Sequence, residues 1–438
     1  MENTDLDFSV DRLDECRIPS PMSMVRFVDD GDHVLYHSRL YEIQTYLERG
    51  TPPPAFEAAG PRERILFDPK RLSCGIVTCG GICPGLNDVI RAVVLSLFHH
   101  YGVRTVFGFR YGYEGLTKEN RNRPMILTPE TVEGIHLQGG TILGTSRGPQ
   151  DAGEMVDTLE HLDVGILFAV GGDGTLKGAQ ALAEEIKRRG LRIAVIGIPK
   201  TIDNDILFVE ESFGFETAIS EARKVISAAN CEAMGARNGI GLVKLMGRQS
   251  GFIATYATLA NSDVNFCLIP EVPFTLEGFL PALRTRLAER GHAVIVVGEG
   301  AGQSLMEKTL ERDASGNERL GDIGVFLRDH IRDHFRNAGT EINLKYIDPS
   351  YTIRSTPPNA RDSAFCLLLG HHAVHAGMAG RTNMVVGVWK GEATHLPIAH
   401  AVSGRKQIDP QGKLWSSVLS CTGQPREKIG RASCRERV

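Results

Sequence analysis

Two short polar segments carry the residue types needed for metal-assisted phosphoryl transfer to a hydroxyl. The first, Phe168–Thr175, reads FAVGGDGT, and the second, Pro199–Asp205, reads PKTIDND. Each includes or follows an apolar run suited to a buried strand, and in a parallel sheet the turns after such strands meet at the same carboxyl edge. We therefore expect Asp173, Asp203 and Asp205 to face one crevice beside backbone amides, as phosphoryl transfer requires.

The GGDGT segment combines amide donors with a carboxylate. Mg²⁺ prefers one or two carboxylates together with phosphate oxygens of a substrate, so Asp173 is the predicted metal ligand, directly or through water. Gly174 leaves space where a side chain would press on a nucleotide. In a purely structural alternative, Asp173 caps a helix that begins near Thr175, and the two roles are compatible.

The PKTIDND segment places two carboxylates two residues apart, which can point to the same side of an extended chain. One of Asp203 and Asp205 can accept the proton of a substrate hydroxyl while the other positions metal or substrate. Lys200 adds a cation for an anionic transition state, and Thr201 adds a hydroxyl. The alternative is an Asx-rich turn without chemistry, because Asp and Asn favour turns.

A third segment, Gly80–Asn87 (GGICPGLN), follows a strand and opens a helix, so its backbone amides could meet a phosphate. It lacks the lysine and hydroxyl of a Walker loop, and a plain tight turn is the alternative. Cys79 and Cys83 lie close together here, but no second cluster accompanies them, so we do not expect a metal site.

The patterns around these segments predict an α/β fold with mainly parallel sheets. Strand, glycine turn, helix and strand alternate, which is typical of a parallel sheet. A second set of similar elements beyond Phe213 predicts two α/β lobes with the site between them. The expected strands are 74–80, 104–109, 165–170, 192–198, 240–245 and 293–299, and the expected helices are 86–101, 175–189 and one containing Leu327, Ile331 and Phe335.

Composition sets the class of protein. The chain has 438 residues, 42% hydrophobic and 23% charged, which is enough for two core-forming domains. Its formal charge of -4 and pI near 6.4 give no global attraction for nucleic acid or an anionic membrane. Nine scattered cysteines indicate a reducing compartment. The start, MENTDLDF, lacks the features of a signal peptide, so we expect a cytoplasmic protein.

Several separated motifs together resemble the 6-phosphofructokinases, from about Cys74 to Gly423, in the forms of the ATP-dependent plant and trypanosomatid branch. This resemblance implies two Rossmann-like lobes, MgATP and fructose 6-phosphate as substrates, and a homotetramer or homodimer. The motifs are GGICPGLN, FGFRYGYEGL (107–116), GGTILGTSRG (139–148), GGDGT, PKTIDND, ARNGIGLVKLMGRQSGF (236–252) and KYIDPSYTIRSTPPNA (345–360).

The resemblance also implies domain limits. Residues 71–214 and 352–405 would form the nucleotide-binding lobe, and residues 215–351 and 406–427 the sugar-phosphate lobe. Residues 1–70, which contain the run Pro52–Pro54, would be an extension serving as a decorative or oligomer-contacting arm. The basic end, residues 428–438, has no apolar period and reads as a non-native tail.

The resemblance assigns roles at matching positions. Asp203 would be the general base that deprotonates the 1-hydroxyl of the sugar, Asp205 would support the metal and the geometry, and Asp173 would hold Mg²⁺ on ATP. Lys200 and Thr201 would flank the transfer path. The ATP site would be lined by Gly81, Arg147, Gly172, Gly174 and Thr175, with Arg147 stabilising charge on the transferring group.

The sugar site would come from the second lobe. Met246, Gly247, Arg248 and Glu299 match substrate positions, and Tyr351 and Arg354 match the region that grips the 6-phosphate. Arg237 corresponds to an arginine that reaches the sugar site of a neighbouring subunit. Each arginine could otherwise be a surface ion pair.

Two positions bear on the phosphoryl donor. Family members that use pyrophosphate typically have Asp at the position of Gly174, where it would crowd and repel a nucleotide, and Lys at the position of Lys200. This chain has the glycine of the ATP type and the lysine of the other. Because a steric and charge block is harder to evade than an added cation, we expect ATP, with pyrophosphate as the alternative.

Other classes are weighed against this prediction. GGDGT also occurs in NAD kinases and diacylglycerol kinases, but the PKTIDND, MGR and YTIR segments argue against them. A non-catalytic regulatory subunit is a further alternative, and the intact Asp173 and Asp203 argue against it. Leu95 stands where many bacterial enzymes of the family have a second effector-binding arginine beside the one at Arg91, so the effectors do not follow from the resemblance.

Overall fold

The computed structural model describes residues 6–23, 25–119, 124–307, 311 and 319–425. The chain forms two compact units. Unit 1 comprises Met1–Thr201, Ile206–Gly214 and Thr356–Arg405, and unit 2 comprises Ile202–Asp205, Phe215–Ser355 and Lys406–Val438. The expected non-native tail, 428–438, lies outside the described residues.

Unit 1 is built on a nine-stranded sheet with the order β2-β3-β15-β14-β9-β8-β5-β6-β7. The five strands from β14 to β6 are parallel, and the outer strands are antiparallel to their neighbours. Continuous apolar runs form the central strands because both faces are covered. The strands are β2 His33–Leu35, β3 Ala55–Ala58, β5 Ser73–Thr78, β6 Thr105–Phe109, β7 Met125–Ile126, β8 Val164–Gly171, β9 Ala194–Pro199, β14 Met384–Trp389 and β15 Glu392–Pro397.

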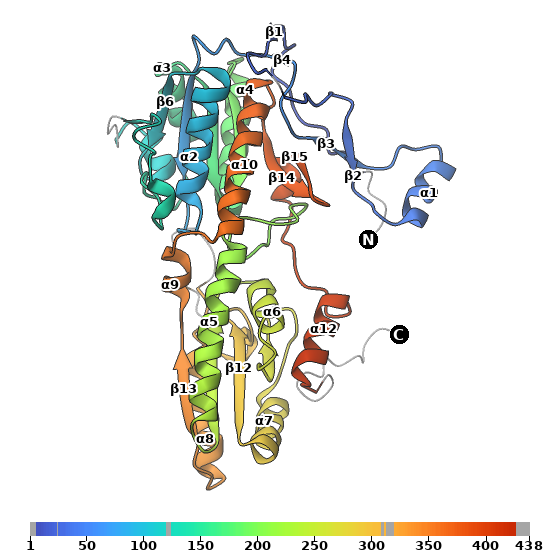
Figure 1. Cartoon of the computed structure of the whole chain (residues 1–438), viewed down its shortest axis with the longest axis vertical. Coiled ribbons are helices and arrows are strands. Elements are labelled where there is room, and N and C mark those ends of the chain that lie inside the picture. The colour runs from blue at the N-terminus through green and yellow to red at the C-terminus, as the bar shows by residue number, and fades with distance from the viewer. Residues whose placement is uncertain (1–5, 24, 120–123, 308–310, 312–318, 426–438) are drawn as a thin grey trace. The chain divides into compact units, whose positions relative to one another are not determined.

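Helices cover both faces of this sheet. On one face, α2 (Leu86–Ser96) and α10 (Ala360–Met378) lie side by side (Figure 1), and a Cβ at Gly370 would come within 2.5 Å of Ala92. On the other face, α3 (Ala152–His161) and α4 (Asp173–Arg188) pack into one apolar core with β8 and β9. The predicted helix 86–101 is confirmed, but its last turn, Leu97–Tyr101, is a π-helix.

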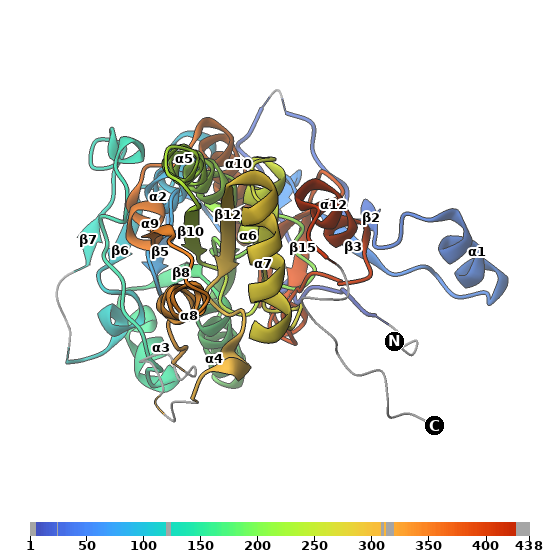
Figure 2. The ribbon, with the colours of Figure 1, turned by 90° about the horizontal axis from the view of Figure 1, so that it is seen from below.

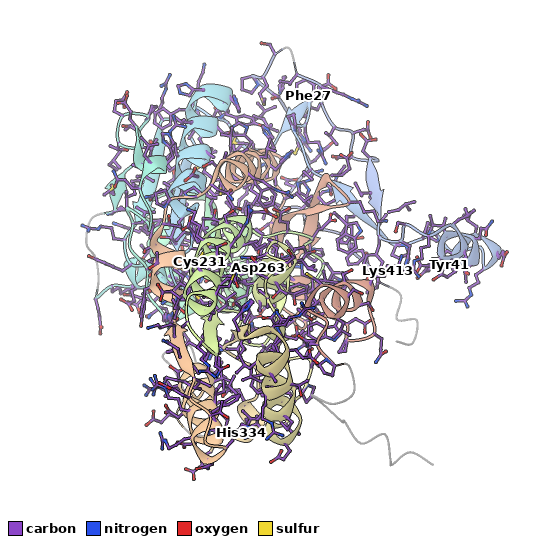
Figure 3. The ribbon with its side chains drawn as sticks, turned by 60° about the horizontal axis from the view of Figure 1, so that its bottom comes forward. Phe27, Tyr41, Cys231, Asp263, His334 and Lys413 are labelled. Carbon is purple, nitrogen blue, oxygen red and sulfur yellow. The ribbon has the colours of Figure 1, made fainter. Side chains whose placement is uncertain are left out.

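The first 70 residues are not a separate extension. The short strands β2 and β3 continue the sheet of unit 1, and Phe56 of β3 is fully buried. Two further strands, β1 (Ile18–Pro19) and β4 (Arg64–Ile65), pair with each other. Helix α1 (Leu40–Glu48) has no buried residue and stands away from the sheet in both views, with Tyr41 exposed on it (Figures 2 and 3).

A buried cluster of charged residues explains why the sequence did not predict that β3 belongs to the sheet. Glu57 of β3 is 5% exposed, and its carboxylate meets Arg62 at 3.0 Å, Arg381 at 2.7 Å and His395 at 3.3 Å. Burial opposes ionisation, but these partners lower the pKa of Glu57 overall. Because Glu57 is a polar residue buried by distant partners, the sequence around it lacks the alternation of polar and apolar residues that would indicate a strand.

Unit 2 holds a four-stranded, fully parallel sheet with the order β11-β12-β10-β13. Its strands are β10 Gly239–Leu245, β11 Phe266–Leu268, β12 His292–Gly298 and β13 Asn343–Ile347. Two of them confirm the predicted strands 240–245 and 293–299.

Helices also cover both faces of the second sheet. The long helix α5 (Phe215–Met234) packs so closely on β10 that a Cβ at Gly241 would lie 2.9 Å from the Ala229 carbonyl oxygen. On the opposite face, α7 (Leu276–Arg290) and α8 (Ile323–Asn337) close an apolar core. The predicted helical face of Leu327, Ile331 and Phe335 is confirmed, because all three are buried there. The other α-helices among the described residues of unit 2 are α6 Phe252–Leu259, α9 Ser350–Ser355 and α12 Lys413–Thr422.

Each unit is therefore an α/β layer structure with a mainly parallel sheet, as the sequence predicts. Among the helices of the described residues, none has the length and apolar character needed to cross a membrane. The eight cysteines that the structure describes are all free thiols.

Two histidines of α10 should make unit 1 sensitive to acid. Burial, together with His395, lowers the pKa of His372 to about 4, and burial lowers that of His375 to about 2. Since the ordinary value is about 6.5, the unfolded chain binds these protons more readily. The stabilisation is complete above about pH 6.5 and is lost as the pH falls toward 4. From His372 alone, we expect the free energy of unfolding to be about 2 kcal/mol lower at pH 5 than at pH 7.

Urea unfolding at the two pH values measures this difference. His372→Gln should reduce the loss by about the share of His372, whereas His33→Gln, at an exposed position, should leave it unchanged. Equal losses in the wild type and in His372→Gln would contradict the assignment.

Candidate active site

The carboxyl ends of three adjacent parallel strands of unit 1 bring the predicted phosphate residues to one edge. The turn Cys79–Gly85 follows β5, Gly172 follows β8, and Lys200 follows β9. The Lys200 backbone amide donates to the Gly171 carbonyl at 3.0 Å, and its Nζ donates to the Gly81 carbonyl at 2.5 Å. Lys200 is 6% exposed, so its ammonium group is held against the first glycine turn.

Helix α4 begins at Asp173, two residues earlier than predicted. Gly172 is the N-cap, so Asp173 lies in the first turn and the capping alternative for its side chain is wrong. A carboxylate there is favourable because the helix dipole is positive at this end. The Asp173 carboxylate lies 2.9 Å from Lys177 Nζ and 4.0 Å from Arg405 Nη2.

The glycines of the GGDGT segment differ in what the fold requires. A Cβ at Gly171 would lie 2.1 Å from Thr175 Oγ1, so the packing demands glycine there. A Cβ at Gly174 would meet no atom within 4 Å, and this residue is exposed. Thr175 is buried, and its carbonyl accepts a hydrogen bond from Tyr113 Oη at 2.7 Å. The space in front of Gly174 is therefore not filled by its own unit.

The glycine turn after β5 has the backbone that its sequence suggests. Gly80 has φ +83° and Gly85 has φ +100°, which glycine adopts without strain. Cys79 and Cys83 are buried, and burial raises the pKa of Cys79 to about 12, so it stays a thiol. Arg147 is exposed in the irregular segment before α3.

In unit 2 the predicted sugar residues also follow adjacent strands. Met246, Gly247 and Arg248 follow β10, and Glu299 follows β12, which pairs with β10 in register. The Arg248 amide donates to Glu299 Oε1 at 3.1 Å, and a Cβ at Gly300 would come within 1.5 Å of the Arg248 carbonyl oxygen. The structure therefore brings these predicted residues together.

The third predicted sugar segment follows β13, on the other side of β10. It forms the short helix α9, on which Tyr351 is 81% exposed. The Arg354 guanidinium carbon lies 5.2 Å from the centre of the Tyr351 ring. Because β12, β10 and β13 are parallel, α9 begins at the same edge of the sheet as the MGR loop and Glu299.

Arg237 does not join this group within its own unit. It is exposed just before β10, at the amino edge, whereas the MGR loop follows the carboxyl end of the same strand. The seven residues of β10 separate the two ends by roughly 20 Å at the usual rise per residue.

The aspartate segment is a turn, not the extended chain that the sequence predicts. Ile202 and Asp203 form the turn, and Asn204 has φ +54°, a left-handed conformation that Asn tolerates better than most residues. Asp205 is 6% exposed and Asp203 is partly exposed. The two carboxylates thus have different surroundings, which permits different roles for them.

A residue that the sequence did not single out ties this turn to the sugar loop inside unit 2. The Lys406 amide donates to the Asp205 carbonyl at 2.8 Å, and its Nζ donates to Asn204 Oδ1 at 3.1 Å. The Lys406 carbonyl accepts from Ser250 Oγ at 2.7 Å, and the Ser250 amide bonds to the Gly247 carbonyl. No local pattern signals these partners, because they lie about 200 and 150 residues away along the chain.

Asp173 belongs to unit 1, whereas Asp203 and Asp205 belong to unit 2. The convergence of the three carboxylates therefore remains a prediction. Within the described part of the chain, no group of three or more His, Cys, Asp or Glu side chains has an arrangement that could hold a metal ion.

Comparisons with known proteins agree with the sequence resemblance. The sequence model of the phosphofructokinase family matches residues 73–377. The chain is 48% identical to the ATP-dependent 6-phosphofructokinase of Amycolatopsis methanolica, over 99% of this chain and 98% of that protein. It is 46% identical to the enzymes of the same name from Borreliella burgdorferi, over 97% and 98%, and Trypanosoma cruzi, over 96% and 88%.

A solved structure shares the fold at much lower identity. The pyrophosphate-dependent phosphofructokinase from Marinobacter aquaeolei superposes with a TM-score of 0.66 at 19% identity, covering 82% of this chain and 92% of that one. This similarity confirms the predicted fold class, and at such identity it says nothing of the phosphoryl donor.

Proposed function

The chain belongs to the phosphofructokinase family, and from this premise we propose that it transfers the γ-phosphoryl group of MgATP to the 1-hydroxyl of fructose 6-phosphate. The products are fructose 1,6-bisphosphate and ADP, and the step belongs to glycolysis. The observation that carries the proposal is what lies at the carboxyl edge of each sheet. The edge in unit 1 has the glycine turns and Lys200, and the edge in unit 2 has the MGR loop, Glu299 and α9.

Unit 1 supplies the nucleotide side. The amides around Gly81 and Gly172 and the amino end of α4 bind phosphate oxygens, because these groups are positively polarised. Lys200 offsets negative charge along the transfer path, and Thr201 offers a hydroxyl. Arg147, exposed in its loop, closes on the transferring group and stabilises its charge.

Unit 2 supplies the sugar side. The backbone and side chains of the MGR loop and Glu299 bind the hydroxyls of the sugar. Arg354 and Tyr351 bind the 6-phosphate, and Arg354 Nε is a buried donor that no atom of the described residues accepts. A phosphate would satisfy this donor with a charge-assisted hydrogen bond.

Asp203 removes the proton of the 1-hydroxyl as that oxygen attacks the γ-phosphorus. Lys406 holds the neighbouring Asn204 and Asp205 against the sugar loop, which keeps the base and the acceptor sugar in one rigid body. Proximity of this kind supplies a large part of the acceleration in phosphoryl transfer.

The residues of this chain fit Mg²⁺ that arrives with ATP. Asp173 offers a partly exposed carboxylate at the phosphate edge, and Mg²⁺ commonly takes only one or two carboxylates when phosphates and waters complete its shell. When bound, the ion neutralises charge on the phosphates. Asp205 would support the bound metal.

The donor is the finer part of the proposal. Gly174 leaves open space before the phosphate edge, which suits a nucleotide, and the relatives named above are ATP-dependent. A coupled assay with ATP or pyrophosphate as sole donor tests it. Turnover with ATP alone supports the proposal, turnover with pyrophosphate alone replaces the donor, and turnover with neither favours a non-catalytic regulatory subunit.

We also propose a homotetramer or homodimer, located in the cytoplasm, without nucleic-acid or membrane partners. Arg237 supports assembly, since it lies at the opposite edge of its own sheet and can serve a sugar site only in another subunit. Arg237→Ala should raise the KM for fructose 6-phosphate at least about tenfold, because one charged hydrogen-bond partner of the substrate is lost. Light scattering of wild type and variant should show the same assembly, and a monomeric wild type would contradict the proposal.

A further inference from the structure

Lys244 is a partly buried cation that the functions above do not use. It lies on β10, two residues before Met246, and its side chain is only 12% exposed. Its side chain shares a face of the sheet with Leu242, which belongs to the core under α7 and α8. A lysine buried in this position needs anionic partners.

Two aspartates from distant segments supply them. Lys244 Nζ lies 2.8 Å from Asp348 Oδ2 and 3.0 Å from Asp322 Oδ2. Burial alone would lower the pKa of Lys244, but its hydrogen bonds to Asp348 and Asp322 raise that pKa overall. The ammonium group is therefore charged at neutral pH and holds both carboxylates.

Each aspartate uses its other oxygen to start a helix. Asp348 Oδ1 accepts hydrogen bonds from the Ser350 amide at 3.1 Å and the Ser350 hydroxyl at 2.5 Å, at the first residue of α9. Asp322 Oδ1 accepts from the amides of Gly324 and Val325 at 3.0 and 3.1 Å and so caps α8. Lys244 thus connects two helix starts to the strand that leads into the MGR loop.

The two helices depend on this connection to different degrees. Helix α8 has 15 residues, five of them buried, and its buried side chains hold it in place without the lysine. Helix α9 has six residues, and Ile353 is its only buried residue. So short a helix is marginal by itself, and its orientation depends on its cap and on what anchors that cap.

We propose that Lys244 is a positioning residue that sets the place of α9, and thereby of Tyr351 and Arg354, for the phosphate of the acceptor sugar. The proposal rests on the proposed function for the identity of that substrate. Lys244 touches neither substrate in this scheme. It acts through Asp348, which it fixes relative to the MGR loop.

Steady-state kinetics test the proposal. Lys244→Met keeps the unbranched stem of the side chain but removes its charged end, and it should raise the KM for fructose 6-phosphate about tenfold. The KM for ATP should stay within about twofold and kcat within about threefold, because the phosphate edge of unit 1 is unchanged. Equal changes in both KM values, or none, would overturn the proposal.

Two further variants distinguish the two ion pairs of Lys244. Asp348→Asn should reproduce the change in KM, and the double variant with Lys244→Met should be little worse than either single one, since both act through one contact. Asp322→Asn is the matched control, because it weakens the other ion pair of the same lysine while its Oδ1 can still cap α8. If Asp322→Asn raises the KM for the sugar as much as Asp348→Asn, the lysine serves general stability only.

Hydrogen exchange of the unliganded protein tests the positioning without any reaction. Lys244→Met and Asp348→Asn should speed amide exchange in residues 350–355 while α5 keeps its protection. Faster exchange in a protein that does not phosphorylate fructose 6-phosphate would leave the positioning role intact and reject the proposed function. Unchanged exchange in α9 in both variants would reject the positioning role, whatever the activity.

Discussion

Asp203→Ala should abolish nearly all turnover while the protein still binds fructose 6-phosphate. Loss of a positioned general base typically lowers kcat by about 10²–10⁴-fold. Sugar binding should persist because Glu299 and Ser250 hold the MGR loop and Lys406 holds Ser250. Steady-state kinetics give kcat, and calorimetry with fructose 6-phosphate gives the affinity of the variant.

Two comparisons sharpen this prediction. Asp203→Asn keeps the shape of the side chain and the turn but cannot take a proton, so it should be almost as inactive as the alanine variant. Asp333→Asn removes a carboxylate that is 62% exposed on α8 and should leave kcat unchanged. A kcat for Asp203→Asn within threefold of the wild type would assign the proton transfer to another group.

The sequence predicted the elements that local pattern encodes. The strands at 165–170 and 192–198 and the glycine turn after β5 are confirmed, because continuous apolar runs and glycines at strand ends are local features. The predicted start of α4 was two residues too late, since Gly172 rather than Asp173 is its N-cap. Sequence patterns fix helix starts less well than helix existence.

The parts that the sequence missed depend on contacts between distant residues. Within the first 70 residues, Glu57 of β3 is held by hydrogen bonds with Arg381 and His395. Both partners lie more than 300 residues away along the chain. No local pattern singled out Lys406 or Lys244, yet the fold gives each of them oxygen partners from other segments. No periodicity marks such residues, because their role arises only when the segments meet.

Gly174→Asp should lower kcat/KM for ATP by about 10²–10³-fold without weakening the fold. A like charge about 4 Å from a phosphate oxygen costs roughly 4 kcal/mol at the dielectric usual near a protein surface. The helix itself should tolerate or favour the change. A Cβ at position 174 would meet no atom within 4 Å, and an acidic side chain in the first turn of α4 interacts well with the helix dipole.

The matched variant is Gly174→Ala, which adds the Cβ without the charge and should cost less than about tenfold in kcat/KM for ATP. Both variants should unfold at or above the temperature of the wild type, because replacing glycine in a helix reduces the entropy lost on folding. The ratio of pyrophosphate-dependent to ATP-dependent turnover should rise in Gly174→Asp, since Lys200 remains to bind the smaller donor. If Gly174→Asp uses ATP as well as Gly174→Ala does, then the open space before Gly174 does not receive the nucleotide, and the choice of donor is made elsewhere.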